Sequence, residues 1–562
     1  MDAQPQLAVL GVATGLVTAI VILGFRSLID FSLGFLPEGE VENFEGLDVI
    51  TRILSVMGGA CILALLLNRY STSARRVGVV HVMERLSRHQ GYLPLKNAMI
   101  QFIGGAIALI SGQSGGREGP AIHLGATAAS LLGRASRLPN NSIRTMVACG
   151  TAAAIASSFN TPIAGVIFAM EVVMMEYTIA SFIPVIVAAV TSTLVTQIVY
   201  GSEPAFTVTQ LQMHSLLEIP YLLIGGILIG CVAAGYIQLI SLFARFSERP
   251  VWMRIIAAGA ITAAASVFFP QVMGVGYDTV DQIMLSEMSI VLLLGLLLAK
   301  GVTSAATVGL GVPVGLIGPT LFMGAALGGI FGAVLIDWQG ADISIGFYVM
   351  LGMSAMMGAV LQAPLAALMA VMEMTANTSL VMPAMLIIVV ASLVTSEVFK
   401  QRSAYISVLN TLGLQYPPSP VTLHLQRVGA TAIMDRDFQR TNARISPDTA
   451  KGILAAKPRW LVINDDEGEI TAVLNPSDLA AFVDGWDETP QEDFEINLLR
   501  IPGQRMDVAT ISAQATVMQV QELLNRTGTE ACCVTRTTAP MIAPLVGVIT
   551  QNDIENYRDK SE

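Results

Sequence analysis

Glu118 stands among residues that favour the binding of an anion. The segment GGREGPAIHLGA (115–126) places it where glycines and a proline open an apolar helix. The first backbone N–H groups of a helix have no acceptor within it, and the positive end of the helix dipole adds to their attraction for anions. An ionised carboxylate can occupy such a site and leave it when protonated. Glu118 is therefore a candidate gate and proton acceptor, and a simple helix-capping carboxylate is the alternative.

The same arrangement recurs about 200 residues later. GREGPAIHLGATAASLLG (116–133) aligns without a gap on GLIGPTLFMGAALGGIFG (315–332), with matching glycines and prolines. Residues 150–171 align in the same way on 352–373, and the two offsets, 199 and 202 residues, are nearly equal. The nearly equal offsets predict a duplicated membrane unit of about 200 residues. Transporters built from inverted repeats bind their ion where the repeats meet, so we expect the ion site there. Two facing helix N-termini would bind an anion without a full positive charge and so could release it.

Composition divides the chain into a membrane part and a soluble part. Only 13% of the 562 residues are charged and 53% are hydrophobic, with a mean hydropathy of +0.64. These values exclude a single soluble globular domain. Of the 73 charged residues, 34 fall in residues 416–562. We expect a multi-pass α-helical membrane domain at 1–415, with repeat halves at about 1–200 and 215–415, and a soluble domain at 416–562.

The apolar stretches of the first 400 residues indicate broken as well as complete membrane helices. Several are long enough to cross a bilayer, namely 180–200, 219–244, 255–269 and 380–396. The stretch 288–299 is short for a full span, and 348–373 is long but contains glycine and proline. Interrupted helices are tolerated in a membrane where they line an internal cavity. Asp2 precedes the first apolar run, so we expect a membrane helix there and not a cleaved signal.

The other chemistry-bearing residues indicate neither an enzyme nor a metal centre. The zinc motif HExxH is absent, and the five histidines are scattered. The five cysteines show no CxxC spacing, so packing is their expected role. The sequence has no stripe of basic residues that would predict nucleic-acid binding. We expect no metal, no required cofactor and no nucleic-acid partner. A cation channel would need acidic pore residues, whereas the feature that the repeats share is backbone N–H.

Residues 416–562 predict an α/β domain of two similar halves, 426–484 and 500–562. Runs typical of strands alternate with helical ones. The strand-like runs are RWLVIN, ITAVL, ACCVT and PLVGVIT, and the helical ones are DTAKGILAA, PSDLAAFVD, TVMQVQELLN and QNDIENYR.

Four motifs together resemble the CLC family of chloride channels and chloride/proton antiporters: GREGP (116–120), GLIGP (315–319), FNTPIAGVIFAME (159–171) and SAYISVL (403–409). The resemblance covers about 1–415. It implies a homodimer in a lipid bilayer, with one anion pathway per subunit and chloride or a similar small anion as substrate. It also implies that Glu118 is the gating glutamate and that the Tyr405 hydroxyl coordinates the central anion. The remaining anion-binding residues that it implies, chiefly through backbone N–H groups, are Leu316, Ile317, Gly116, Arg117 and Gly119.

One departure from the family concerns the anion. Where the family has GSGIP, with a serine hydroxyl on the anion, Val77 of RRVGVVH (75–81) stands in for that serine. Valine cannot donate a hydrogen bond. A preference for chloride therefore cannot come from this side chain, and coordination at Val77 must come from backbone N–H groups, Tyr405 or water.

A second departure concerns protons. In FAMEVV (168–173), Glu171 is kept, but Val172 takes the position at which the family's antiporters carry a proton-relaying glutamate. Channels of the family commonly have valine there. The resemblance thus favours a passive or weakly coupled conductor, and the alternative is an antiporter with another relay, such as Glu171, Glu176 or His81. Because Glu171 and Glu373 are equivalent in the two repeats, a structural role at helix ends is favoured for them.

The two halves of the C-terminal domain resemble a pair of CBS regulatory modules. GVITQNDIENY (547–557) implies that Thr550 and Asp553 contact the ribose and phosphates of an adenine nucleotide. AVLNPSDLAAF (472–482) has Asn475 and Asp478 at the corresponding positions. Helix capping is the alternative role for these residues. We expect a bacterial inner or plasma membrane protein whose C-terminal domain is cytoplasmic.

Overall fold

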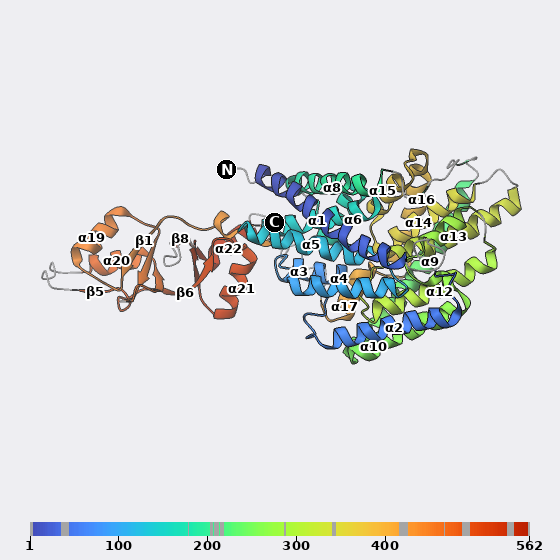
Figure 1. Ribbon diagram of the computed structural model, residues 1–562. Helices are drawn as coiled ribbons and strands as arrows, with labels where there is room; N and C mark the ends of the chain where they lie inside the picture. Colours follow the sequence, from blue (N-terminus) through green and yellow to red (C-terminus); the bar gives the residue numbers. More distant parts are fainter. Residues whose placement is uncertain are drawn as a thin grey trace. The chain divides into compact units, whose positions relative to one another are not determined.

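A computed structural model describes residues 4–34, 44–177, 179–202, 206, 213, 218–285, 288–339, 344–414, 425–426, 428–465, 467–485, 495–536 and 545–559. The chain forms two compact units (Figure 1). The membrane unit consists of Met1–Ser136 and Ser142–Pro417, and the C-terminal unit of Arg137–Asn141 and Pro418–Glu562. The expected domain boundary between 415 and 416 lies outside the described residues.

The membrane unit is helical. Its α-helices are α1 (Gln4–Leu33), α2 (Val49–Asn68), α3 (Gly78–Arg88), α4 (Leu95–Ile110), α5 (Glu118–Ala135), α6 (Asn140–Phe159), α7 (Pro162–Phe168), α8 (Ile179–Tyr200), α9 (Ile219–Ala244), α10 (Val251–Phe268), α11 (Tyr277–Met284), α12 (Ile290–Gly309), α13 (Ile317–Gln339), α14 (Ile345–Leu361), α15 (Pro364–Thr375), α16 (Val381–Leu393) and α17 (Ala404–Thr411). The π segments η1 (Ala169–Met174) and η6 (Val394–Val398) continue α7 and α16. The short 3₁₀ segments are η3 (Arg245–Glu248), η4 (Pro270–Val272) and η5 (Thr378–Leu380). Within the described residues, eight helices are long and apolar enough to cross a membrane, so the predicted multi-pass helical fold is confirmed.

The prediction that 288–299 forms a short segment is wrong, because α12 continues to Gly309. The second half of this helix is rich in small and hydroxyl residues, and it is packed among other helices. Thr303, Ser304 and Thr307 are fully buried, and each hydroxyl donates to a carbonyl one turn earlier. Low hydropathy therefore marks burial in protein here, not the end of the helix.

Each repeat contains a helix that ends at a residue with left-handed backbone, and a new helix begins two residues later. Asn160, with φ of 59°, separates α6 from α7, which begins at Pro162. Gln362, with φ of 52°, separates α14 from α15, which begins at Pro364. A residue before proline is pushed out of the helical region, and a left-handed residue commonly ends a helix. The matching breaks support the predicted repeat, and the long run at 348–373 is interrupted as expected.

Glycines let equivalent helices cross closely in both repeats. Gly125 of α5 lies against Gly150 of α6, and a Cβ on either would overlap the carbonyl oxygen of the other. Gly324 of α13 and Gly352 of α14 are paired in the same way. Small residues allow this approach of two backbones. These crossings fix α5 and α13, whose N-termini carry the motifs of interest.

The C-terminal unit has an α/β fold of two halves. The first half contains η7 (Ala430–Ala432), β1 (Phe438–Asn442), β2 (Arg444–Ile445), α19 (Pro447–Ala456), β3 (Trp460–Asn464), β4 (Ile470–Leu474), α20 (Pro476–Asp484) and β5 (Ile496–Asn497). The second contains β6 (Arg505–Ser512), α21 (Val517–Thr527), β7 (Ala531–Thr535), β8 (Leu545–Thr550) and α22 (Gln551–Asp559). The main sheet has the order β1-β3-β4-β6-β7-β8, with β1–β3 and β6–β7 parallel and the other neighbours antiparallel. The predicted α/β fold is confirmed, whereas four strands were not predicted: the half-buried, polar β1 and β6 and the two-residue β2 and β5.

We expect Gly150→Ala and Gly352→Ala to lower the thermal unfolding midpoint of the detergent-solubilised protein. The added methyl group meets a backbone oxygen, and overpacking of this kind costs about 1–3 kcal/mol. Gly24→Ala in α1 is the matched control, since nothing lies within 4 Å of a Cβ there. Alanine is also the better helix former, so this control should be neutral or slightly stabilising. Equal midpoints for all three variants would contradict the close crossings.

Candidate anion-binding site

The loops before α5 and α13 are joined to each other by backbone hydrogen bonds. The Gly116 N–H donates to the Gly315 carbonyl at 2.7 Å, and the Gly315 N–H donates to the Gly116 carbonyl at 2.6 Å. The bridge is antiparallel and links equivalent positions of the two repeats, as a two-fold relation between them requires. A Cβ on Gly119 would lie 2.6 Å from the Gly315 Cα, so glycine is needed for this approach. Two helix N-termini therefore lie next to each other.

Glu118 is completely buried where these N-termini meet. Its Oε2 accepts the backbone N–H of Gly318, in the first turn of α13, at 3.3 Å. Its Oε1 accepts the hydroxyl of Tyr277 at 2.6 Å. A buried carboxylate is stable only where donors compensate for its lost hydration. The position of the carboxylate is thus one that suits an anion.

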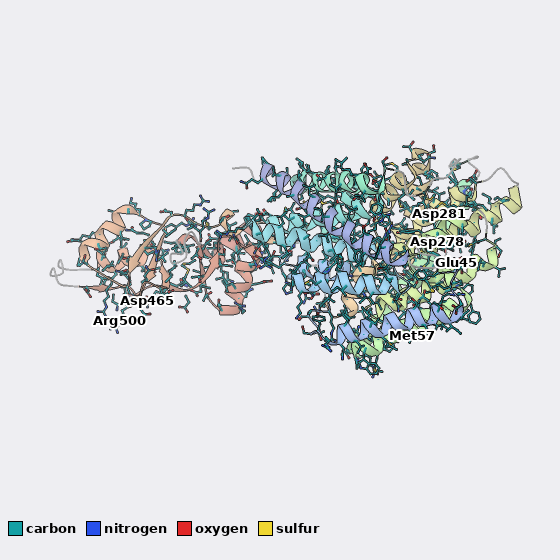
Figure 2. All side chains as sticks on the ribbon, viewed as in Figure 1. Glu45, Met57, Asp278, Asp281, Asp465 and Arg500 are labelled. Carbon is teal, nitrogen blue, oxygen red and sulfur yellow. The ribbon has the colours of Figure 1, made fainter. Side chains whose placement is uncertain are left out.

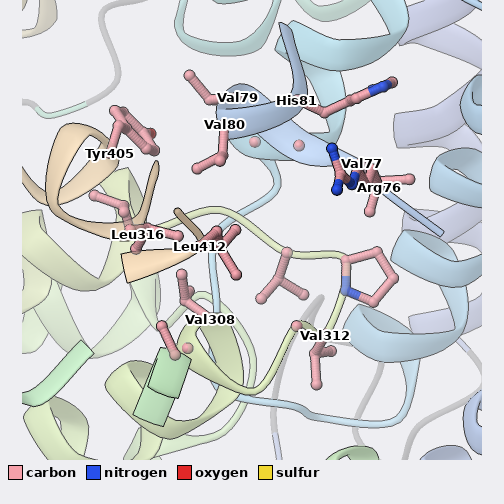
Figure 3. A pocket seen from close by; sticks show the side chains of 18 of the residues that line it. Arg76, Val77, Val79, Val80, His81, Val308, Val312, Leu316, Tyr405 and Leu412 are labelled. Atoms are coloured by element: carbon pink, nitrogen blue, oxygen red, sulfur yellow. The ribbon is translucent and has the colours of Figure 1, made fainter. Parts of the chain in front are cut away.

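The two chain neighbours of Glu118 line two different cavities. The Tyr405 cavity, of about 170 Å³, includes Gly119, Leu316 and Tyr405 in its lining (Figure 3). The Tyr277 cavity, of about 210 Å³, includes Arg117 and Tyr277. Arg117 and Gly119 are the chain neighbours of Glu118, yet they line different cavities. The Glu118 carboxylate is hydrogen-bonded to Tyr277, which lines the second cavity.

The Tyr405 cavity offers uncharged donors. Tyr405, in the first turn of α17, is 4% exposed, and its hydroxyl has no hydrogen-bond partner in the described part of the chain. Helix α3 begins at the same cavity, with Val77 as an N-cap residue that forms no side-chain capping bond. The first N–H groups of α3 are thus left for another acceptor. A hydroxyl and amide donors, which carry no formal charge, therefore line the same cavity.

Arginines give the wall of the Tyr405 cavity a positive charge. One lining carboxylate, Glu84, forms an ion pair with Arg76. The lining includes three arginines, namely Arg75, Arg76 and Arg254. Like-signed groups around a cavity raise the local concentration of the opposite ion. This wall favours anions over cations.

The Tyr277 cavity carries charges of both signs. Arg117 lies over the Tyr277 ring, 5.5 Å from its centroid. Arg26 forms an ion pair with Asp30 at 3.4 Å and also lines the cavity. Asp281 is a further lining residue, and it lies in the same region as Asp278 and Glu45 (Figure 2). Arg117, the arginine next to Glu118 in the chain, therefore places a positive group beside the tyrosine that is hydrogen-bonded to Glu118.

The residues of the predicted anion site do not all lie around one cavity. Leu316, Val77 and Gly119 line the Tyr405 cavity together with Tyr405. Ile317 lines a separate apolar cavity of about 20 Å³. The N–H of Gly116 is used in the bridge to Gly315, so it supplies no donor to an anion.

Val172 and Glu171 occupy different surroundings. Val172, in η1, is 4% exposed and belongs to the apolar core. The Glu171 carboxylate accepts the N–H groups of Leu365 and Ala366, at 3.3 and 2.8 Å, where α15 begins. Glu373 accepts the equivalent two N–H groups at the start of α7, at 2.9 and 2.8 Å. Each glutamate thus caps the helix of the other repeat, as its equivalent position predicts.

The other candidate relays are also hydrogen-bonded. Glu176 is buried and lies 3.5 Å from Arg144. His81 Nδ1 and His123 Nε2 are 2.9 Å apart and both rings are buried. His81 is in the lining of the Tyr405 cavity, although its ring is directed away from the centre (Figure 3).

Sequence reasoning missed Tyr277 and Lys300. Lys300 is fully buried in α12, and its ammonium group donates to the carbonyls of Val272, Gly274 and Val275 at 3.1, 3.0 and 3.1 Å. These carbonyls immediately precede Tyr277. A lysine within an apolar helix is a recognisable signal of a built site, whereas a tyrosine after GVG gave none.

The C-terminal unit has a cavity of about 640 Å³ whose lining includes Thr550, Asp553 and Asn475. The Thr550 hydroxyl donates to Asp553 at 2.7 Å, and Asn475 accepts the N–H of Ser477 at 3.0 Å. The Thr550 hydroxyl also accepts the N–H of Asp553 at 3.3 Å in the first turn of α22, and Asn475 is the N-cap of α20. Asp478 does not line the cavity, and its carboxylate accepts the N–H of Gln504 at 3.2 Å.

Comparison with known proteins gives consistent matches. A family model described as voltage gated chloride channel matches residues 58–396. The chain is 30% identical over 396 residues to a putative chloride channel protein ClcB-like of Ralstonia nicotianae, covering 68% of this chain and 91% of the relative. It is 28% identical over 404 residues to the voltage-gated ClC-type chloride channel ClcB of Escherichia coli (strain SMS-3-5 / SECEC), covering 70% and 96%.

Solved structures share the fold. A slow cyanobacterial Cl⁻/H⁺ antiporter matches with a TM-score of 0.64 at 20% identity, covering 74% of this chain and 100% of that one. A eukaryotic CLC transporter matches with a TM-score of 0.58 at 19% identity, covering 97% of both chains. A CLC-type fluoride/proton antiporter matches with a TM-score of 0.60 at 22% identity, covering 72% and 97%.

We expect Glu171→Gln and Glu373→Gln to lower the unfolding midpoint by similar amounts. Each change weakens one cap of the same reciprocal pair, and the loss of a capping group costs about 0.5–2 kcal/mol. Thermal unfolding in detergent, with Glu397→Gln at an exposed glutamate as control, measures this. A change in ion transport by Glu171→Gln alone, at an unaltered midpoint, would contradict a purely structural role.

Proposed function

The chain belongs to the voltage-gated chloride channel (CLC) family, and from that premise we propose that it conducts chloride or a similar small anion passively, with Glu118 as the gate. The members of this family are channels and transporters, not enzymes. CLC-type anion transport is therefore the activity of the chain. The gating mechanism and the absence of proton coupling are our proposal.

One observation carries the proposed gate: the buried Glu118 carboxylate accepts a hydrogen bond from Tyr277, which lines one cavity, while the next residue, Gly119, lines the other. We propose that the carboxylate separates the two cavities. It accepts hydrogen bonds from Gly318 and Tyr277. An ionised carboxylate held in this way excludes an anion from its place, both by volume and by charge. Protonation removes the charge that the two donors stabilise, so the side chain can leave and the cavities can join.

Passive conduction is supported by the residues that would have to carry a proton. Val172 cannot bind one, and Glu171 is used as a helix cap. The apolar cavity at Ile317 holds about 20 Å³, and Thr161 is the one polar side chain in its lining. A buried water needs two to four polar partners, so a chain of waters is not favoured there. The alternative is a chloride/proton antiporter, for which His81 and its partner His123 offer a different relay.

The proposed anion ligands are mainly uncharged. In the Tyr405 cavity they are the Tyr405 hydroxyl and the first N–H groups of α3, next to Val77. At the gate they are the N–H of Gly318 and the backbone near Leu316 and Ile317. Such donors bind an anion weakly enough for passage, and no cofactor is required. Without a hydroxyl at Val77, we propose that discrimination between chloride and other small anions is weak.

The remaining assignments follow from family membership. We propose a homodimer in a bacterial plasma membrane, with the membrane domain at 1–415 and the CBS-like pair at 416–562. The arginines of the Tyr405 cavity favour a cytoplasmic position for that cavity and for the C-terminal domain that follows α17. We further propose that the 640 Å³ cavity of the C-terminal unit binds an adenine nucleotide through Thr550, Asp553 and Asn475, since its volume suits such a ligand.

We expect acid to increase anion efflux through the wild type, because protonated Glu118 can leave its place. Glu118→Gln should increase efflux at neutral pH and abolish this response to acid. Glutamine resembles the protonated carboxyl group, so it leaves no charge in the anion's place. Chloride efflux from proteoliposomes, with Glu397→Gln as the matched control at an exposed glutamate, measures both effects. A wild-type efflux no faster than that of empty vesicles would refute anion conduction, and an unchanged pH response in Glu118→Gln would refute the gate.

Passive conduction also predicts that the reversal potential of the anion current ignores a pH gradient. A channel couples no proton to the anion, so the chloride gradient alone sets the potential. The measurement uses planar bilayers with a fixed chloride gradient and two pH values on one side. A clear shift with pH would show exchange, and its loss in His81→Gln would then identify the histidine pair as the relay.

A further inference from the structure

Tyr277 supplies the second donor to the Glu118 carboxylate. Its hydroxyl lies 2.6 Å from Oε1, while the Gly318 N–H lies 3.3 Å from Oε2. Tyr277 also lines a cavity that is distinct from the one lined by Tyr405. Each cavity thus has a tyrosine next to the proposed route.

The fold, and not Glu118, sets the position of this hydroxyl. The Lys300 ammonium group fixes the preceding loop through three carbonyls. Gly276, with φ of 84°, makes the turn from which α11 starts at Tyr277. The Tyr277 ring also contacts Phe159 and Phe206, with centroids 6.4 and 6.3 Å apart. The donor therefore stays in place when the carboxylate leaves.

Donors that hold a carboxylate oxygen also suit an anion in the same place. When Glu118 is protonated or leaves, the Tyr277 hydroxyl and the Gly318 N–H lose an ionised acceptor, and hydrogen bonds to charged groups are among the stronger ones. Arg117 lies over the Tyr277 ring and adds positive charge beside it. We propose that the Tyr277 hydroxyl is an anion ligand, bound alternately by the Glu118 carboxylate and by the transported anion. This inference rests on the proposed function.

Chloride binding to the gate-free protein tests the proposal directly. In Glu118→Ala the carboxylate is absent, so its place is available to chloride. Isothermal titration of the purified Glu118→Ala protein with chloride should reveal binding at this place. Adding Tyr277→Phe should raise the Kd of that binding at least about tenfold, because a hydrogen bond to a charged group contributes about 1.5 kcal/mol or more. Tyr221→Phe is the matched control, since its hydroxyl donates to the Phe331 carbonyl. Identical isotherms with and without the Tyr277 hydroxyl would overturn the proposal.

A second measurement uses the intact gate. Tyr277→Phe alone removes a donor from the carboxylate, so Glu118 should hold the gate closed less firmly and efflux at neutral pH should rise. A purely structural role would lower the unfolding midpoint without this rise in efflux. If Tyr277→Phe unfolds, 3-fluorotyrosine at 277, whose hydroxyl is the stronger donor, should tighten chloride binding, and unchanged binding would again overturn the proposal. If the wild type conducts anions but Tyr277→Phe leaves the chloride isotherm unchanged, this inference alone is refuted. If the wild type shows no efflux, the proposed function is refuted.

Discussion

The reciprocal hydrogen bonds between Gly116 and Gly315 are the constraint on which the rest of the membrane unit depends. They join equivalent points of the two repeats and bring the N-termini of α5 and α13 together. A side chain at Gly119 or Gly315 would separate them. The glycine crossings of α5 on α6 and of α13 on α14 hold both helices in this arrangement. The proposed anion site then lies between the repeats and is built from backbone that neither could position alone.

The unit treats its few buried charges in one consistent way. Glu118 is held by a backbone N–H and a hydroxyl, and Lys300 by three backbone carbonyls. Glu171 and Glu373 each bind two N–H groups of the opposite repeat. Backbone dipoles thus compensate for charges that lipid would not tolerate. The same dipoles would bind a mobile anion without trapping it, which is what conduction requires.

Repetition made much of the fold predictable, because a motif that occurs twice at one offset constrains three-dimensional symmetry. It pointed to a structural role at helix ends for Glu171 and Glu373. Hydropathy with glycine and proline pointed to the interruption within 348–373, and the break at Pro162 is its counterpart in the first repeat. Hydropathy did not predict the C-terminal end of α12, because the buried hydroxyl residues in its second half lower the hydropathy as a helix end would. Tyr277 was not predictable, because its contact with Glu118 joins residues 159 positions apart and nothing local marks it. The use of Gly116 in the bridge likewise depends on the tertiary pairing.

The proposed gate requires that the Glu118 carboxylate occupies a place where an anion can also bind. Anomalous diffraction from crystals grown in bromide, in the wild type and in Glu118→Ala, shows whether it does. The wild type should show the carboxylate between Gly318 and Tyr277, without bromide there. Glu118→Ala should show a bromide peak within hydrogen-bond distance of the Gly318 nitrogen and the Tyr277 hydroxyl. A Glu118→Ala structure with bromide bound elsewhere and none at this position would contradict the account.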